Sequence, residues 1–128
     1  MKKSKKKIMI VDDDYDIANL FKVFLECNEY YVDAYTNPID ALNNFRKYSH
    51  NLIILDLKMP KMDGITLYKK IKEIDDKVII CLTTADKNFI QDLQKGITDI
   101  EKVVVYKPVL LKDLKNKIDS VLISWLVI

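Results

Sequence analysis

The sequence has little of the residues that mark fibrous, loop-rich or disulfide-bonded proteins. Its 128 residues include two glycines, three prolines and two cysteines. These low counts argue against a collagen-like chain, a disordered chain and a small disulfide scaffold. Cys27 and Cys81 lie far apart in apolar segments, and neither belongs to a CxxC or Cys/His cluster. We predict that both are reduced core residues.

Long apolar runs are also missing. No segment approaches the roughly 20 apolar residues that a membrane-spanning helix needs. The lysine-rich start lacks the apolar core and small-residue cleavage site of a signal peptide. We therefore expect no membrane span and a cytoplasmic location.

The charge is nearly balanced overall but uneven along the chain. The net charge is +2, yet five lysines lie within the first seven residues. Residues 1–6 are predicted to form a basic, solvated tail without direct nucleic-acid binding, because no interleaved aromatic residues accompany these lysines. Residues 7–128 are long enough for one domain with its own core.

Short apolar runs alternate with segments of helical spacing. The runs cover residues 8–11, 31–35, 52–55, 78–82 and 103–106. Between and after them, apolar stripes at helical spacing predict five helices; the first stripe is Ile17, Leu20, Phe21 and Phe24. This alternation predicts an α/β fold, a doubly wound parallel sheet of five strands with helices on both faces. Asp33 interrupts the second run, which is typical of an edge strand.

Polar residues follow four of the runs directly. They are Asp12, Asp13 and Asp14 after the first run, Asp56 after the third, Thr83 and Thr84 at the end of the fourth, and Lys107 after the fifth. The carboxyl ends of parallel strands meet at one edge of the sheet, where such folds bind ligands. We therefore expect these side chains to lie close together.

The residue types in this group suggest a particular chemistry. Neighbouring carboxylates repel each other unless a cation neutralises them, and oxygen ligands at a hydrated site suit Mg²⁺. A metal ion and a lysine beside Asp56 make sense if this carboxylate accepts a phosphoryl group, because such transfers depend on neutralising the phosphoryl oxygens. Of the acidic triplet, Asp14 is predicted to cap a helix N-terminus.

Four segments together carry a resemblance to a known family. In order and spacing, "IMIVDDDYDI", "LIILDLKMPKMDGI", "CLTTA" and "VVVYKP" resemble the receiver domain of two-component response regulators, over about residues 7–122. The resemblance implies a flavodoxin-like (βα)5 fold with strand order 2-1-3-4-5. It also implies a stand-alone receiver, residues 7–128, with an apolar extension of the last helix.

The resemblance also implies roles for individual residues. Asp56 would be the phosphoacceptor, and Mg²⁺ would be bound by Asp12, Asp13, Asp56 and the backbone carbonyl of Lys58. Lys107 would bind the phosphoryl oxygens and precede a cis proline. The site hydroxyl is assigned to Thr84, because Ala85 follows it, with Thr83 as the alternative; only one can face the site, since side chains alternate along a strand.

Partners and output follow from the same resemblance. The phosphoryl donor would be a sensor histidine kinase or a phosphotransfer protein, and the chain would catalyse only its own phosphorylation and dephosphorylation. Signalling would use the face of the fourth helix, fifth strand and fifth helix, although Val104 stands where many receivers have an aromatic switch residue. A homodimer would form through this face or through the apolar end "SVLISWLVI", which could equally extend the last helix or begin a longer protein.

Two rival functions remain. The fold could be a receiver-like interaction module that is never phosphorylated, but such modules usually lack an acidic or lysine position present here. An aspartyl-dependent phosphohydrolase needs a second carboxylate two places after the nucleophile, where this chain has Lys58. Lys58 and Asp86 are expected instead to border the path of attacking water, and His50 is predicted to be a surface loop residue.

Overall fold

The computed structural model describes residues 5–86 and 104–126, with side chains up to residue 122. In chain order, the elements are β1 (Lys7–Val11), α1 (Tyr15–Cys27), β2 (Tyr31–Tyr35), α2 (Pro38–Asn44), β3 (Leu52–Asp56), α3 (Gly64–Ile74), β4 (Ile79–Thr84), β5 (Val104–Tyr106) and α5 (Leu111–Leu126). The helix predicted around residues 89–97 lies outside the described residues. Each predicted strand is present, with ends shifted by two residues at most.

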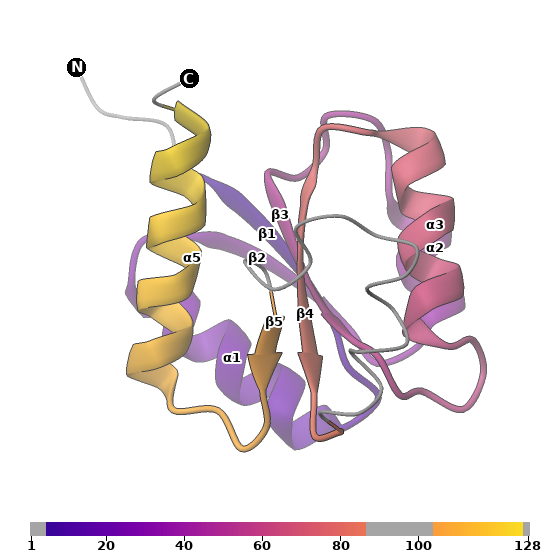
Figure 1. Cartoon of the computed structure of the whole chain (residues 1–128), viewed down its shortest axis with the longest axis horizontal. Helices are drawn as coiled ribbons and strands as arrows, with labels where there is room; N and C mark the ends of the chain where they lie inside the picture. The colour runs from indigo at the N-terminus through magenta and orange to yellow at the C-terminus, as the bar shows by residue number, and fades with distance from the viewer. Residues whose placement is uncertain (1–4, 87–103, 127–128) are drawn as a thin grey trace.

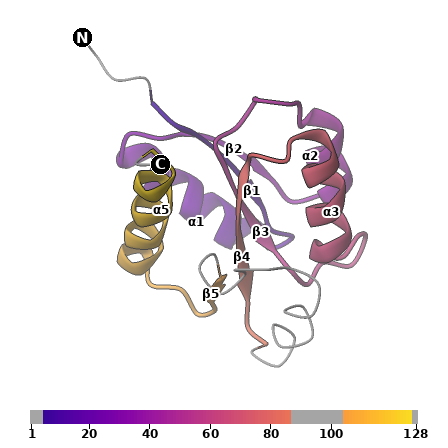
Figure 2. The same ribbon diagram turned by 45° about the horizontal axis from the view of Figure 1, so that its top comes forward.

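The strands form one parallel sheet in the order β2-β1-β3-β4-β5, which confirms the predicted topology. Helices α1 and α5 lie on one side of the sheet, and α2 and α3 lie on the other (Figure 1). The turned view in Figure 2 shows the sheet between the same two pairs of helices. Strand β2 is at one edge, as its interruption by Asp33 predicted.

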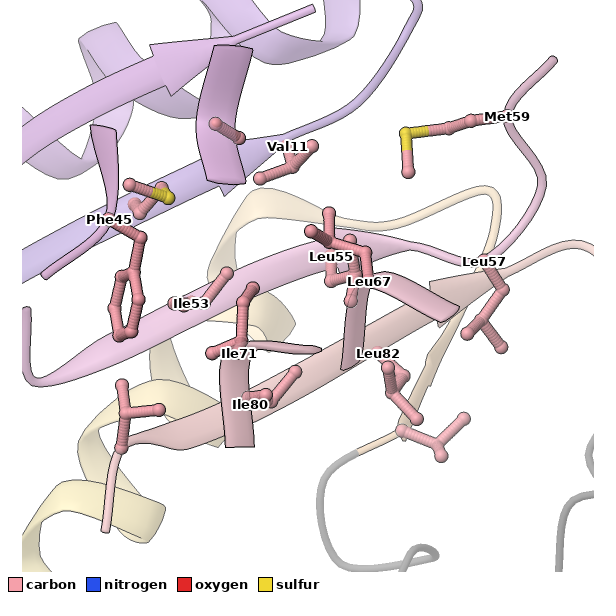
Figure 3. Close-up of a cluster of buried hydrophobic side chains, with 14 residues drawn as sticks. Val11, Phe45, Ile53, Leu55, Leu57, Met59, Leu67, Ile71, Ile80 and Leu82 are labelled. Atoms are coloured by element: carbon pink, nitrogen blue, oxygen red, sulfur yellow. The ribbon is translucent and has the colours of Figure 1, made fainter. Parts of the chain in front are cut away.

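Each face of the sheet has its own apolar core. The first core packs Met9, Val11, Ile53, Leu55 and Leu82 against α2 and α3, as Figure 3 shows for most of its members. The second packs the alternate strand residues Ile8, Ile10, Ile54 and Cys81 against α1 and α5. Alternation of side chains along each strand therefore decides which face any residue at a strand end joins.

Side-chain caps determine where the helices begin. The Asp14 carboxylate accepts hydrogen bonds from the backbone N–H groups of Asp16 and Ile17 at 3.0 and 3.2 Å, so its predicted capping role is confirmed. Gly64 opens α3 against the sheet: a Cβ there would lie 2.6 Å from the Leu57 Cα atom. Only glycine fits this approach, which brings the start of α3 beside the end of β3.

Two predictions about burial were wrong, and one residue of a predicted apolar stripe faces outward. Cys27 is exposed at the end of α1, although Cys81 is buried and both are free thiols as predicted. Leu20 is 52% exposed on α1, because Ala18, Phe21 and Leu25 form the buried face instead.

His50 is the second wrong prediction about burial, because it is buried rather than on the surface. His50 is 8% exposed, and its ring packs against Phe45. Its Nε2 atom lies 2.8 Å from the Asp33 carboxylate, and its Nδ1 atom lies 2.8 Å from the Ser49 hydroxyl. Both ring nitrogens therefore have hydrogen-bond partners, so the imidazole can be buried without an unpaired polar atom. The segment around His50 is still a loop, as its polar sequence predicted.

Candidate functional site

A lysine and three aspartates meet at the carboxyl edge of the sheet. The Lys107 ammonium lies 3.0 Å from an Asp12 oxygen and 3.4 Å from an Asp56 oxygen. Asp12, Asp13 and Asp56 each place a carboxylate oxygen within 4.8 Å of the others. Asp12 and Asp56 are 2% and 5% exposed, whereas Asp13 faces solvent. The predicted cluster of charged groups is therefore present.

Strand pairing explains why residues so distant in sequence meet. Ile10 pairs with Ile54 and Val11 with Leu55, so the next residues along β1 and β3 are Asp12 and Asp56. On the other side of β3, Asp56 pairs with Thr83 of β4. The backbone N–H of Lys107 donates to the Thr84 carbonyl at 2.8 Å, which fixes the lysine just beyond β5.

Two further features of Lys107 concern its backbone and its reach. The peptide between Lys107 and Pro108 is cis, as the resemblance implied. The direct contact between Lys107 and Asp12 was not predicted, because β5 and β1 are separated by two strands in the sheet. Only the reach of the lysine side chain joins them.

Burial and charge shift the acidity of the central carboxyl group. Burial, and then the nearby Asp12 carboxylate, raise the pKa of Asp56 to about 6, against the opposing effects of Lys107 and of the Lys58 backbone N–H. That N–H donates to the Asp56 carboxylate at 3.3 Å. Burial lowers the pKa of Lys107, but its bonds to Asp12 and Asp56 outweigh this effect, so its pKa is raised. The Lys107 ammonium alone therefore does not offset the effects of burial and of Asp12 on the Asp56 carboxyl group.

This set of oxygens fits a small divalent cation. Three carboxylates within 4.8 Å of one another supply hard oxygen ligands, and the exposed side of Asp13 leaves room for the waters that Mg²⁺ retains. The raised pKa of Asp56 shows that more positive charge at this place would be favourable. The site therefore has the composition of a Mg²⁺ site; the use of the Lys58 carbonyl as a ligand stays a prediction.

The two candidate hydroxyls both lie at the end of β4. Thr83 and Thr84 are each 1% exposed. The Thr84 hydroxyl oxygen accepts a hydrogen bond from the Asp86 backbone N–H at 3.1 Å. In the part of the chain that the structure describes, the Thr83 hydroxyl has no hydrogen-bond partner. The choice of Thr84 as the site hydroxyl stays a prediction.

An ion pair lies beside the acidic group. The Lys58 ammonium is 3.1 Å from the Asp86 carboxylate, and their side chains are 61% and 38% exposed. The sequence placed both residues near the site but did not predict that they pair.

Val104, where many receivers have an aromatic residue, is buried in the core on the α2 and α3 side.

Comparisons with known proteins agree with this geometry. The family model described as the response regulator receiver domain matches residues 8–119. The probable transcriptional regulator ycf27 of Porphyra purpurea is 35% identical over 124 residues, which cover 95% of this chain and 49% of that protein. The transcriptional regulatory protein ResD of Bacillus subtilis is 35% identical over 95 residues, 73% of this chain and 40% of ResD. The chain thus spans about half the length of these relatives, or less.

Solved structures show the same likeness. A response regulator receiver domain protein (CheY-like) from Methanospirillum hungatei has a TM-score of 0.82 and 29% identity, covering 94% of this chain and 96% of that one. The response regulator TrrA of Thermotoga maritima, solved in complex with Mg²⁺ and BeF, has a TM-score of 0.78 and 30% identity, covering 90% and 97%. Among the helices that the structure describes, none has the length and apolar character needed to cross a membrane.

Proposed function

Because the chain belongs to the response regulator receiver domain family, we propose that it accepts a phosphoryl group on Asp56 from a sensor histidine kinase or a phosphotransfer protein. One observation carries the proposal. The Asp56 carboxylate ends its strand almost buried, with a raised pKa, between the Lys107 ammonium and two further carboxylates. A structural role alone does not account for so many charged groups at one edge of the sheet.

The transfer is a displacement at phosphorus. An Asp56 carboxylate oxygen forms the new bond to phosphorus, while the bond from phosphorus to the donor atom breaks and the donor keeps the electron pair. Lys107 binds the phosphoryl oxygens, and the hydroxyl of Thr84, or alternatively of Thr83, donates a hydrogen bond to one of them. Asp12, Asp13, Asp56 and the Lys58 carbonyl would hold Mg²⁺, which would neutralise the phosphoryl charge.

Output would follow from a shift between two conformations of the same fold. New bonds from the phosphoryl group to Lys107 and the site hydroxyl favour one conformation, and a partner reads the change at the face formed by the fourth helix, predicted around residues 89–97, together with β5 and α5. Residues 7–128 would form the receiver, after a basic tail of residues 1–6, and would act in the cytoplasm. A homodimer would form through the same face or through the apolar end of the chain.

Phosphorylation by a small donor tests the proposal directly. The full chain is incubated with Mg²⁺ and acetyl phosphate, and its intact mass is measured. We expect one added phosphoryl group, its loss in Asp56→Asn, and its prevention by EDTA. Asp40→Asn is the matched control, because Asp40 is an exposed aspartate in the first turn of α2. No added mass, or addition that survives Asp56→Asn, would refute phosphorylation at Asp56 and favour the interaction module.

A further inference from the structure

The Thr83 hydroxyl is an unusual group next to this site. It is a buried side-chain oxygen with no hydrogen-bond partner among the described residues, on a residue that is 1% exposed. Buried hydroxyls nearly always have partners, because an unpaired one has lost its bonds to water without replacing them. Its position beside Asp56 suggests that its partner belongs to another state of the site.

Strand alternation places Thr83 on the same face as the reacting groups. Ile8 and Ile10 precede Asp12 at every second position of β1, and Ile54 precedes Asp56 in the same way on β3. Cys81 precedes Thr83 likewise on β4, and Cys81 packs in the core beneath α1 and α5.

The fifth strand continues this row. Val105, which pairs with Thr83, packs in that same core and stands two residues before Lys107. Thr84 instead follows Leu82, which belongs to the core on the α2 and α3 side. Thr83 therefore extends the row of residues that contains Asp12, Asp56 and Lys107.

The Lys107 side chain crosses this row. It begins beyond β5, yet its ammonium reaches Asp56 on β3 and Asp12 on β1. Strand β4 lies between β5 and β3, so the lysine passes over the β4 residues of this face. Thr83 is the β4 residue that pairs with Asp56. Asp12 follows β1, which is farther from β5 in the sheet than β3 is. An ammonium that left Asp12 would therefore move back towards β4.

We propose that Thr83 is a positioning residue, whose hydroxyl oxygen accepts a hydrogen bond from the Lys107 ammonium when that ammonium leaves Asp12 to follow the phosphoryl group. The ammonium has three N–H donors, and two of them face Asp12 and Asp56 in this structure. Thr83 supplies an acceptor for a third. This inference rests on the proposed phosphorylation of Asp56 and gives Thr83 a role that holds whichever threonine hydroxyl bonds to the phosphoryl group.

Kinetics and stability together separate this role from simple packing. Thr83→Val removes the hydroxyl at nearly constant shape. We expect phosphoryl incorporation from acetyl phosphate to become about tenfold slower, because hydrogen bonds to charged groups are among the stronger ones. Thr83→Ser keeps the hydroxyl and is expected to stay within about twofold of the parent rate. The midpoint of urea unfolding of unphosphorylated Thr83→Val is expected to rise, since a buried hydroxyl without a partner is replaced by a methyl group.

Two further variants complete the experiment. Cys81→Ala alters the same face of β4 one repeat earlier, so it should lower the unfolding midpoint without slowing incorporation. In a Lys107→Ala background, Thr83→Val should cause no additional loss, because Thr83 acts through the lysine.

The outcomes distinguish this inference from the proposed function. Normal incorporation by Thr83→Val, a lower unfolding midpoint, or a further loss without the lysine would each overturn the role of Thr83 and leave phosphorylation of Asp56 standing. Absence of incorporation in the parent protein would overturn both.

Discussion

Replacement of Asp56 by asparagine should stabilise the unphosphorylated protein near neutral pH. Asparagine has the shape of the aspartate but no charge, and its carbonyl can still accept the Lys58 backbone N–H. The pKa of Asp56 rises from an ordinary 3.8 to about 6, first through burial and then through Asp12. A difference of about two pKa units corresponds to about 3 kcal/mol, so we expect Asp56→Asn to gain about 2 to 3 kcal/mol in unfolding free energy at pH 7.

The pH dependence gives the prediction its sign. The folded protein holds the Asp56 proton more tightly than the unfolded chain, so this group favours folding below about pH 3.8, and the benefit is lost as the pH rises through about 6. Asp56→Asn has no proton to lose here. The difference between the two proteins should therefore be small near pH 4, grow up to pH 6 and level off above it.

Urea unfolding at a series of pH values measures this difference, and Asp40→Asn is the control. Asp40 is exposed in the first turn of α2, where its charge favours the helix, so Asp40→Asn should lose about 0.5 kcal/mol or less. Added Mg²⁺ should stabilise the parent protein and not Asp56→Asn, because a ligand stabilises only the fold that binds it. If Asp56→Asn were no more stable than the parent protein at pH 7, or if its gain in stability were equally large at pH 4, the reasoning would be refuted. The ionised Asp56 carboxylate would then not be what destabilises the fold.

Two further predictions concern contacts outside the acidic group. Lys58→Ala breaks the ion pair with Asp86 beside the site and should shorten the half-life of the phosphorylated protein by at most about fivefold, because exposed ion pairs contribute about 1 kcal/mol or less. Loss of added mass over time measures it; Lys58→Arg is the control, and a longer half-life would contradict a shielding role. Tyr30→Phe removes the hydroxyl bonded to Asp119 of α5 and should cost about 1 kcal/mol in urea unfolding. Tyr48→Phe, on an exposed ring, should cost nothing measurable, and equal losses in both variants would contradict the role of the bond.

The strands and the site were predictable because they depend on local patterns. Alternating apolar runs gave strand positions within two residues, and residues 31–35 match β2 without a shift. Parallel strands bring their carboxyl ends to one edge, so the gathering of Asp12, Asp56 and Lys107 at this edge followed from their place after each run. The direct contact between Lys107 and Asp12, which reaches across the two strands between β5 and β1, did not follow from it.

The errors concern contacts that form only after the chain folds. His50 lies in a polar loop segment and is buried with a partner, because the Asp33 carboxylate of β2 lies beside its ring. Leu20 fits the apolar spacing of α1 but faces outward, because a helical stripe covers more angle than the sheet contacts. The choice between Thr83 and Thr84 shows the same limit: the motif indicates Thr84, whereas the direction of each side chain depends on the register of β4.

The contact between His50 and Asp33 has a consequence for the alignment of the outermost strand. Among the described strands, β2 pairs with β1 and with no other, so backbone bonds support its register from one side. A slip by one residue would carry Asp33 to the opposite face and leave the imidazole without its acid. The contact between the loop before β3 and Asp33 thus favours the observed register of β2 against β1.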